Sequence, residues 1–458
     1  MSLDAVLAQI DANLPAATDR LLDLLRIKSI STDPAFKQEC QAAADWLVAD
    51  LQSMGVDAQK RETPGHPMVV GHVGPETGKP HLLFYGHYDV QPVDPLHLWD
   101  RDPFDPAIEE TPAGTVIRGR GAADDKGQLM TFVEAFRAWK EVTGEWPCRI
   151  TFFFEGEEES GSPSLVPFMK EHADELRADF AMICDTGMFQ SRTPAITTML
   201  RGLLGEELTI TGPSKDLHSG MFGGIAINPI RVLSRIIASL HDESGRITVP
   251  GFYDGVPELS DELEAQWQGL AFDHAGFLAD VGLSHPAGEQ DRTPLEMIWS
   301  RPTCEVNGIG GGYQGDGFKT VLPSEASAKI SFRLVGDQDP WEIRKNFRAM
   351  VEGMLPPDCS VEWTDHGTGR ASGTPADDPA FARALAALTE EWQIPAAYIG
   401  CGGSIPIAGY FDSILGTTPV LIGFGRDDDQ IHSPNEKYDM ESFHKGIRSW
   451  ARILDAIR

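Results

Sequence analysis

The chain has 458 residues, of which 41% are hydrophobic and 23% are charged, and its 69 acidic against 38 basic residues give a formal charge of -31. This length exceeds the roughly 250 to 300 residues at which a single core stops growing, so two domains are expected. The excess of negative charge repels phosphate backbones and anionic lipid headgroups, which argues against nucleic-acid and membrane partners.

The first predicted element is an amphipathic helix over residues 3–27, where leucine and isoleucine recur at helical spacing between aspartates. This pattern differs from the charged and apolar regions of a signal peptide, and no stretch approaches the ~20 apolar residues that span a bilayer. The six cysteines lie far apart and include no Cys-x-x-Cys pair, as expected for reduced thiols. A cytoplasmic location is therefore expected.

Short apolar runs then alternate with helical stretches up to residue 185. Helices are predicted at 40–54, 127–142 and 163–172, and strands at 68–73, 81–90, 149–155 and 179–185. This alternation is typical of a mostly parallel sheet covered by helices on both faces. The sequence therefore predicts an α/β fold for this part of the chain.

The pattern changes after residue 201. Strands are predicted at 205–211 and 326–335, helices at 228–240, 258–270 and 340–354, and the run 241–302 is otherwise irregular. A helix at 379–393, a buried strand at 419–425 and a helix at 440–457 follow. We therefore expect one large domain built from residues 1–203 and 386–458, with an α+β domain, 204–385, inserted into it.

Acids and histidines follow several predicted strands. His87 and Asp89 come at the end of the strand that begins at residue 81, and an extended backbone puts both side chains on one side. A histidine that binds a metal commonly needs an acceptor for its second ring nitrogen, and Asp89 is the candidate. The alternative is a strand-end histidine followed by an aspartate turn.

Two further segments are acidic. Asp124 and Asp125 precede a helix, where an acid also serves as an N-cap, but the glycine-rich turn 119–127 favours a constrained backbone that presents a carboxylate. A carboxylate can bridge two cations about 3.5 to 4 Å apart. Glu158 and Glu159 belong to an acidic run directly after the apolar strand 149–155. Such a run repels itself unless cations or solvent separate its charges, so a solvated loop is the alternative to a metal site.

Two more candidates follow strands. Asp185 ends the strand at 179–185, and His432 comes shortly after the buried strand at 419–425. The carboxyl ends of parallel strands meet at one edge of a sheet, so two histidines and three or four carboxylates are expected to gather there. Such a set suits two zinc ions and has too few histidines for copper.

Four motifs occur in a characteristic order: GHYDV at 86–90, GRGAADDKG at 119–127, EGEEESGS at 155–162 and HSPNE at 432–436. With them, nearly the whole chain resembles the co-catalytic di-zinc metallopeptidases, which include carnosinases, cytosolic dipeptidases, glutamate carboxypeptidases, aminoacylases and succinyl-diaminopimelate desuccinylases. The resemblance points to the carnosinase-like branch of cytosolic dipeptidases. It implies a catalytic domain and an inserted domain that acts as a lid and forms a homodimer.

The resemblance also implies metal ligands. Asp124 would bridge two zinc ions, His87 and Asp185 would bind one of them, and Glu159 and His432 would bind the other. Manganese and cobalt accept the same ligands, so Mn²⁺ or Co²⁺ stays open.

Catalytic roles are implied for three residues. Glu158 would be the general base that takes a proton from a metal-activated water and passes it to the departing amine. Asp89 would orient His87. His218, in the motif DLHSG at 216–220, would donate to the oxyanion, commonly in the active site of the partner subunit; an ordinary capping or turn residue is the alternative.

By the same resemblance, Thr320, Arg333 and Ser404 would contact substrate, with Arg333 suited to a bidentate grip on a carboxylate. A solvated strand arginine is the alternative for Arg333. The chain departs from the carnosinase-like pattern at Gly400-Cys401, where those members carry Arg-Glu. This departure bears on which substrates are accepted and not on the metal ligands or the general base.

The resulting hypothesis is a cytoplasmic, dimeric, two-zinc hydrolase that cleaves dipeptides or similar small amides bearing a carboxylate. An N-acyl-amino-acid deacylase or carbamoylase is the alternative, because it would use every one of these metal ligands. A non-catalytic binding protein that retains the fold is a further alternative. Both Glu158 and Asp124 are present, whereas a decayed site should have lost its base or its bridging acid.

Overall fold

The computed structural model describes residues 2–75, 78–374, 378–403 and 406–458. The chain divides into two compact units. The main unit comprises Met1–Thr198, Thr374–Ile399 and Ile407–Arg458, and the inserted unit comprises Met199–Gly373 and Gly400–Pro406. The chain passes between the units four times: within strands β8 (Ala195–Leu200) and β16 (Ala397–Cys401), after Gly373 and after Pro406.

The main unit is built on a mixed sheet. Its strands follow the order β1 (Asp57–Arg61), β2 (Met68–Val73), β6 (Arg149–Glu155), β3 (His81–His87), β7 (Phe180–Ile183), β17 (Thr418–Leu421) and β8. The short strand β15 (Ser372–Gly373) and β16 also pair with β8. The central strands β6, β3, β7 and β17 are parallel, whereas β1, β2 and β8 run antiparallel to their neighbours. A small antiparallel sheet joins β18 (Lys437–Asp439), β5 (Gly114–Arg118) and β4 (Ala107–Thr111).

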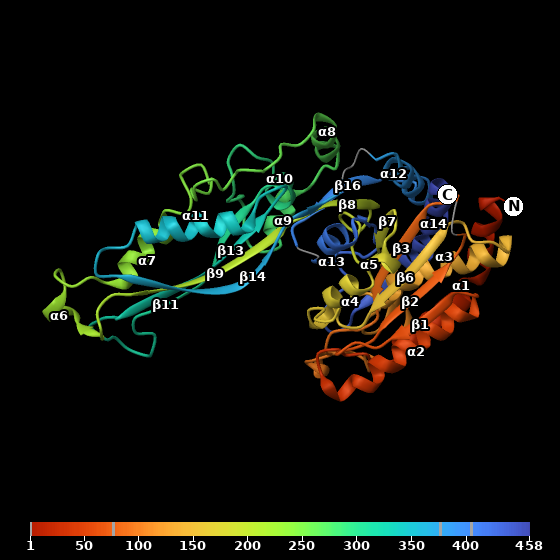
Figure 1. The fold of residues 1–458 in the computed structure, drawn as a ribbon, viewed down its shortest axis with the longest axis horizontal. Coiled ribbons are helices and arrows are strands. Elements are labelled where there is room, and N and C mark those ends of the chain that lie inside the picture. The colour runs from red at the N-terminus through yellow and green to blue at the C-terminus, as the bar shows by residue number, and fades with distance from the viewer. Residues whose placement is uncertain (1, 76–77, 375–377, 404–405) are drawn as a thin grey trace. The chain divides into compact units, whose positions relative to one another are not determined.

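Helices cover this sheet on both sides, as Figure 1 shows. They are α1 (Leu3–Leu25), α2 (Lys37–Ser53), α3 (Lys126–Thr143), α4 (Leu165–Glu171), α5 (Ala173–Leu176), α12 (Pro379–Trp392), α13 (Pro406–Tyr410) and α14 (Met440–Ile457). Successive residues of β6 point to opposite faces. Phe152 packs with Phe132 of α3, which in turn contacts Trp450 of α14, whereas Phe153 stacks on Phe168 of α4.

The inserted unit has its own antiparallel sheet and core. The strand order is β11 (Thr303–Gly311), β13 (Glu325–Leu334), β9 (Gly202–Thr211) and β14 (Ser360–Gly369). Helices α7 (Pro229–Ala238) and α11 (Pro340–Gly353) lie along one face, where alternate residues of β9 and β13 are buried against them. The remaining elements are α6 (Ser219–Phe222), α8 (Asp261–Gly269), α9 (His274–Ala279), α10 (Pro294–Trp299), β10 (Leu217–His218), β12 (Val321–Leu322) and β15 (Ser372–Gly373).

The predicted fold class, a mostly parallel α/β sheet with an inserted α+β domain, is confirmed. The inserted unit nevertheless contains two long strands, β11 and β14, that the periodicity did not predict. Most of their residues are exposed or half-buried, and both strands lie at an edge of the sheet. An edge strand without a buried face lacks the alternation of apolar and polar residues by which a strand is recognised. Among the described residues, no helix is both long and apolar enough to cross a membrane.

Candidate metal centre

Three loops of the candidate centre leave neighbouring parallel strands. His87 is the last residue of β3, Asp185 comes two residues after β7, and Glu158 begins a short 3₁₀ turn three residues after β6. Because these strands are parallel neighbours, their carboxyl ends meet at one edge of the sheet. The structure thereby brings together the strand-end groups that the sequence singled out.

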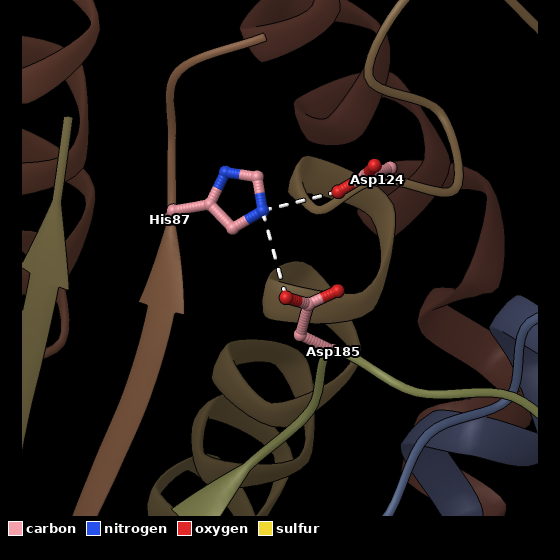
Figure 2. A group of neighbouring side chains, drawn as sticks. All are labelled: His87, Asp124 and Asp185. Carbon is pink, nitrogen blue, oxygen red and sulfur yellow. Dashed lines mark hydrogen bonds and ion pairs between the residues drawn. The ribbon is translucent and has the colours of Figure 1, made fainter. Parts of the chain in front are cut away.

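The first cluster consists of His87, Asp124 and Asp185. The Nε2 atom of His87 lies 3.0 Å from Oδ1 of Asp124 and 3.8 Å from Oδ2 of Asp185. Figure 2 shows the imidazole pointing toward both carboxylates. One potential ligand atom from each residue lies within 4.8 Å of the others, which is close enough to surround a single ion.

The second cluster consists of Asp124, Glu159 and His432. The Nε2 atom of His432 lies 2.9 Å from Oδ2 of Asp124 and 3.2 Å from Oε2 of Glu159, and the three ligand atoms again lie within 4.8 Å. Gln91 donates a hydrogen bond to Oε2 of Glu159 at 2.8 Å. Asp124 therefore presents one carboxylate oxygen to each cluster, which is the arrangement that a bridging ligand needs.

The buried carboxylate of Asp89 connects the two acids after β6 to the His87 ring. Its Oδ1 lies 3.4 Å from Nδ1 of His87 and accepts from the backbone N–H of Glu158 at 3.3 Å. Its Oδ2 accepts from the backbone N–H of Glu159 at 3.0 Å and from the Ser31 hydroxyl at 2.6 Å. Asp89 thus contacts both the His87 ring and the backbone of the loop that carries Glu158 and Glu159. The sequence predicted only the contact with His87.

Hydrogen bonds, burial and neighbouring charges shift the pKa values of these clusters. Hydrogen bonds to Asp124 and Glu159 raise the pKa of His432 to about 10. Burial favours the neutral form of His87, but hydrogen bonds to Asp124 and Asp89 outweigh it and raise the pKa of His87 well above its ordinary value. Burial, reinforced by repulsion from Asp124, raises the pKa of Asp185 to about 7. These raised pKa values favour protons on groups that a cation would otherwise bind.

Glu158 lies beside these clusters. Burial raises the pKa of its carboxyl group; the charge of His87 opposes this, whereas the charges of Glu159, Asp89 and Asp124 add to it. A carboxyl group with a raised pKa accepts a proton more readily near neutral pH. This property suits a general base.

The donor set fits zinc. Each cluster offers one imidazole nitrogen and carboxylate oxygens, the ligands that zinc uses in catalytic sites, and manganese and cobalt accept them as well. The residues present therefore agree with the pair of divalent metals that the resemblance implies.

A third acidic cluster, Asp428, Asp429 and Asp439, differs from these two because a lysine fills it. The Nζ atom of Lys437 donates to one carboxylate oxygen of each aspartate, at 2.9, 2.9 and 2.7 Å respectively. Lys437 therefore occupies the space between these acids and offsets part of their charge.

The sequence predicted no catalytic or ligand role for two residues of the centre, Asp125, which was a possible N-cap, and Glu436. Asp125 accepts a hydrogen bond from the backbone N–H of His87 through Oδ2, at 3.1 Å. Glu436, the last residue of the HSPNE motif, accepts hydrogen bonds from the turn that carries Asp124. These partners are distant in sequence, so no local pattern could have identified them; only their places in the motifs drew attention to the segments.

The remaining predicted residues belong to the inserted unit. His218 caps α6 and its Nδ1 accepts from the backbone N–H of Gly220 at 3.0 Å, and the carbonyl of Thr320 accepts from the backbone N–H of Ser219 at 3.1 Å. Pairing of β10 with β12 places His218 opposite Val321, the residue after Thr320. Arg333 is half-buried on β13. Ser404 lies outside the described residues.

The Gly400-Cys401 step is explained in part by packing. A Cβ atom on Gly400 would lie only 2.4 Å from Cβ of Trp299, so a larger residue there requires Trp299 to move. The thiol of Cys401 accepts from the backbone N–H of Gly403 at 3.4 Å. The tryptophan and the glycine are thus matched to each other.

Comparison with known proteins agrees with this geometry. Residues 83–456 match the model of peptidase family M20/M25/M40. The Cys-Gly metallodipeptidase dug1 of Schizosaccharomyces pombe is 31% identical over 98% of this chain and 97% of its own length, and the Beta-Ala-His dipeptidase of Homo sapiens is 29% identical over 99% and 92%. The solved structure of the M20 family metallo-carboxypeptidase Sso-CP2 from Sulfolobus solfataricus has a TM-score of 0.80 and 29% identity, covering 96% of this chain and 99% of that one.

These matches extend over nearly the whole chain, including both units. They confirm the resemblance inferred from the four motifs. The protein is therefore a member of peptidase family M20/M25/M40.

Proposed function

We propose that the protein is a metal-dependent dipeptidase that uses two zinc ions per subunit. The observation that carries the proposal is the carboxylate of Asp124, whose two oxygens face different histidine-containing clusters. The family match and the dipeptidases among the relatives support the activity. The ligands proposed for one zinc are His87 and Asp185 and for the other Glu159 and His432, with Asp124 shared.

Bound zinc would lower the pKa of a water molecule and polarise the amide carbonyl. In the proposed reaction Glu158 accepts a proton from the attacking water and delivers it to the departing amine. Asp89 keeps the His87 ring and the Glu158 backbone in place, in agreement with its hydrogen bonds.

The substrate would be a dipeptide or a similar small amide with a free carboxylate. Arg333 is the proposed partner of that carboxylate, because a guanidinium binds it through two parallel hydrogen bonds. Thr320 and Ser404 are proposed to contact the substrate as well. The Gly400-Cys401 step, next to Trp299, is expected to affect which substrates are accepted.

His218 is proposed to stabilise the oxyanion. Because its Nδ1 accepts a hydrogen bond from Gly220, the neutral ring carries its hydrogen on Nε2, where it can be donated. We further propose a homodimer formed through the inserted unit, in which His218 serves the active site of the other subunit. All six cysteines are free, which supports a cytoplasmic location.

The proposal is tested by giving the zinc-loaded protein a panel of dipeptides and a panel of N-acyl amino acids. Dipeptides should be hydrolysed, and a Glu158→Gln variant should lose about 100- to 10,000-fold in kcat while retaining its zinc. Glu171→Gln, at an exposed position on α4, serves as the control and should match the wild type. Fast deacylation without peptide hydrolysis would refute the dipeptidase assignment, and near-normal turnover by Glu158→Gln would refute the assigned base.

A further inference from the structure

Glu436 links two loops that carry proposed ligands of one metal. It is fully buried and lies four residues after His432, and its side chain reaches the turn of Asp124. Four donors surround its carboxylate: the backbone N–H groups of Ala123 (3.0 Å) and Asp124 (3.1 Å) at Oε1, and the backbone N–H of Gly121 (3.0 Å) and Nη1 of Arg120 (2.6 Å) at Oε2.

We propose that Glu436 is a positioning residue that sets the separation of Asp124 and His432 before a metal binds. The inference rests on the proposed function, in which both residues bind the same zinc. The backbone of Glu436 contributes as well, because its carbonyl accepts from the N–H of Gly119 at 3.1 Å. The loop of His432 is thereby attached to the turn at both its main chain and its side chain, while His432 and Asp124 stand 2.9 Å apart.

This position requires a carboxylate rather than an amide. All four partners donate hydrogen bonds, so both oxygens must accept. In a Glu436→Gln variant the amide group faces either two backbone N–H groups or one N–H group and Arg120. Either orientation sets donor against donor and pushes the two loops apart without changing the size of the side chain.

The experiment measures zinc affinity of the metal-free full-length protein by competition with a chromophoric chelator. Glu436→Gln should bind zinc about 10- to 100-fold more weakly than the wild type, the range found when a residue that supports a ligand is changed. Activity at saturating zinc should recover, because the ligands themselves remain. A loss of kcat that excess zinc does not restore would contradict a role in positioning for metal binding.

The matched control is Glu134→Gln on α3. Glu134 is also buried and also accepts hydrogen bonds from an arginine, Arg20, at 2.7 and 2.5 Å, but it contacts none of the proposed ligands. This variant should lose stability and keep its zinc affinity. Equal losses of affinity in the two variants would show a general effect of disrupting a buried ion pair and overturn the proposal. A wild-type protein that binds no zinc would instead overturn the proposed function.

A second variant covers the possibility that Glu436→Gln does not fold. Glu436→Asp keeps the charge but is one methylene too short to serve all four donors at once. Its zinc affinity should fall between those of the wild type and Glu436→Gln. Wild-type affinity in Glu436→Asp would overturn the proposal, because the reach of the side chain would then be irrelevant.

Discussion

The imidazole of His432 lies 2.9 Å from the carboxylate of Asp124. The pKa of His432 is raised to about 10, above its ordinary value of 6.5, because the protonated ring pairs with Asp124 and Glu159. A histidine binds zinc only in its neutral form, so zinc and this proton compete for the same nitrogen. Zinc affinity should therefore rise as the pH increases toward the pKa of His432.

Metal binding near neutral pH should accordingly release protons, one of them from His432. Calorimetric titrations with zinc in buffers of different protonation enthalpy would give the number released. His432→Ala should release about one proton fewer than the wild type, because the proton carried by the His432 ring is absent from this variant. His444→Ala, which removes a surface histidine paired with Asp11 on α1, should leave the number unchanged. An unchanged number in His432→Ala would show that this ring is neutral before zinc arrives.

The turn 119–125 is packed against the first turn of α3. Gly127 permits this contact, because a Cβ atom there would lie 1.9 Å from the carbonyl oxygen of Ala122 and 3.0 Å from the ring of Tyr438. The contact supports the backbone that presents Asp124. A displacement of the first turn of α3 would therefore also displace the backbone that carries Asp124.

Gly127→Ala should therefore destabilise the protein by about 1 to 3 kcal/mol, the range for overpacking, and reduce the zinc that copurifies. Denaturant unfolding and metal analysis would measure the two effects. Gly353→Ala, near the end of α11, is the matched control: nothing lies within 4 Å of its new Cβ atom, and it should be neutral or stabilising by up to ~1 kcal/mol. Equal behaviour of the two variants would mean that the turn can move freely.

The elements that the sequence predicted well are those with a buried face. β6 and α14 match their predicted bounds, because a buried strand shows a long apolar run and a helix with a buried face shows apolar residues at helical spacing. The sequence did not predict β11 and β14, because these edge strands have few buried residues and so lack an apolar pattern. The same limit applies to the centre: strand-end positions pointed to His87 and Asp185, whereas the contacts of Glu436 and Asp125 depend on folding that brings distant segments together.

The inserted unit exposes large apolar side chains on the two segments that pair beside His218, where the backbone N–H of Ser219 donates to the carbonyl of Thr320. Phe318 is 92% exposed, Ile225 86% and Met221 75%. Exposed apolar residues that gather in one region often mark a protein interface. This observation supports the proposed dimer.

Phe318→Asp should convert the dimer to a monomer, because a charge would be buried at the interface, and sedimentation velocity would detect the change. If His218 acts in the active site of the other subunit, turnover should fall about 100- to 1,000-fold as well, the typical cost of losing an oxyanion donor. Val281→Asp is the control, at another exposed apolar position of the inserted unit that is 70% exposed, and it should stay dimeric. A Phe318→Asp protein that remains dimeric would place the interface elsewhere.

Lys437 bears on how many metal ions the protein takes up. Of the three acidic clusters among the described residues, the one around Lys437 already contains a cation that cannot dissociate, because it is part of the chain. A tethered counter-ion of this kind is insensitive to the metal concentration of the surroundings. Binding should therefore saturate at the two histidine-containing clusters, and zinc in large excess should find no third place among these acids.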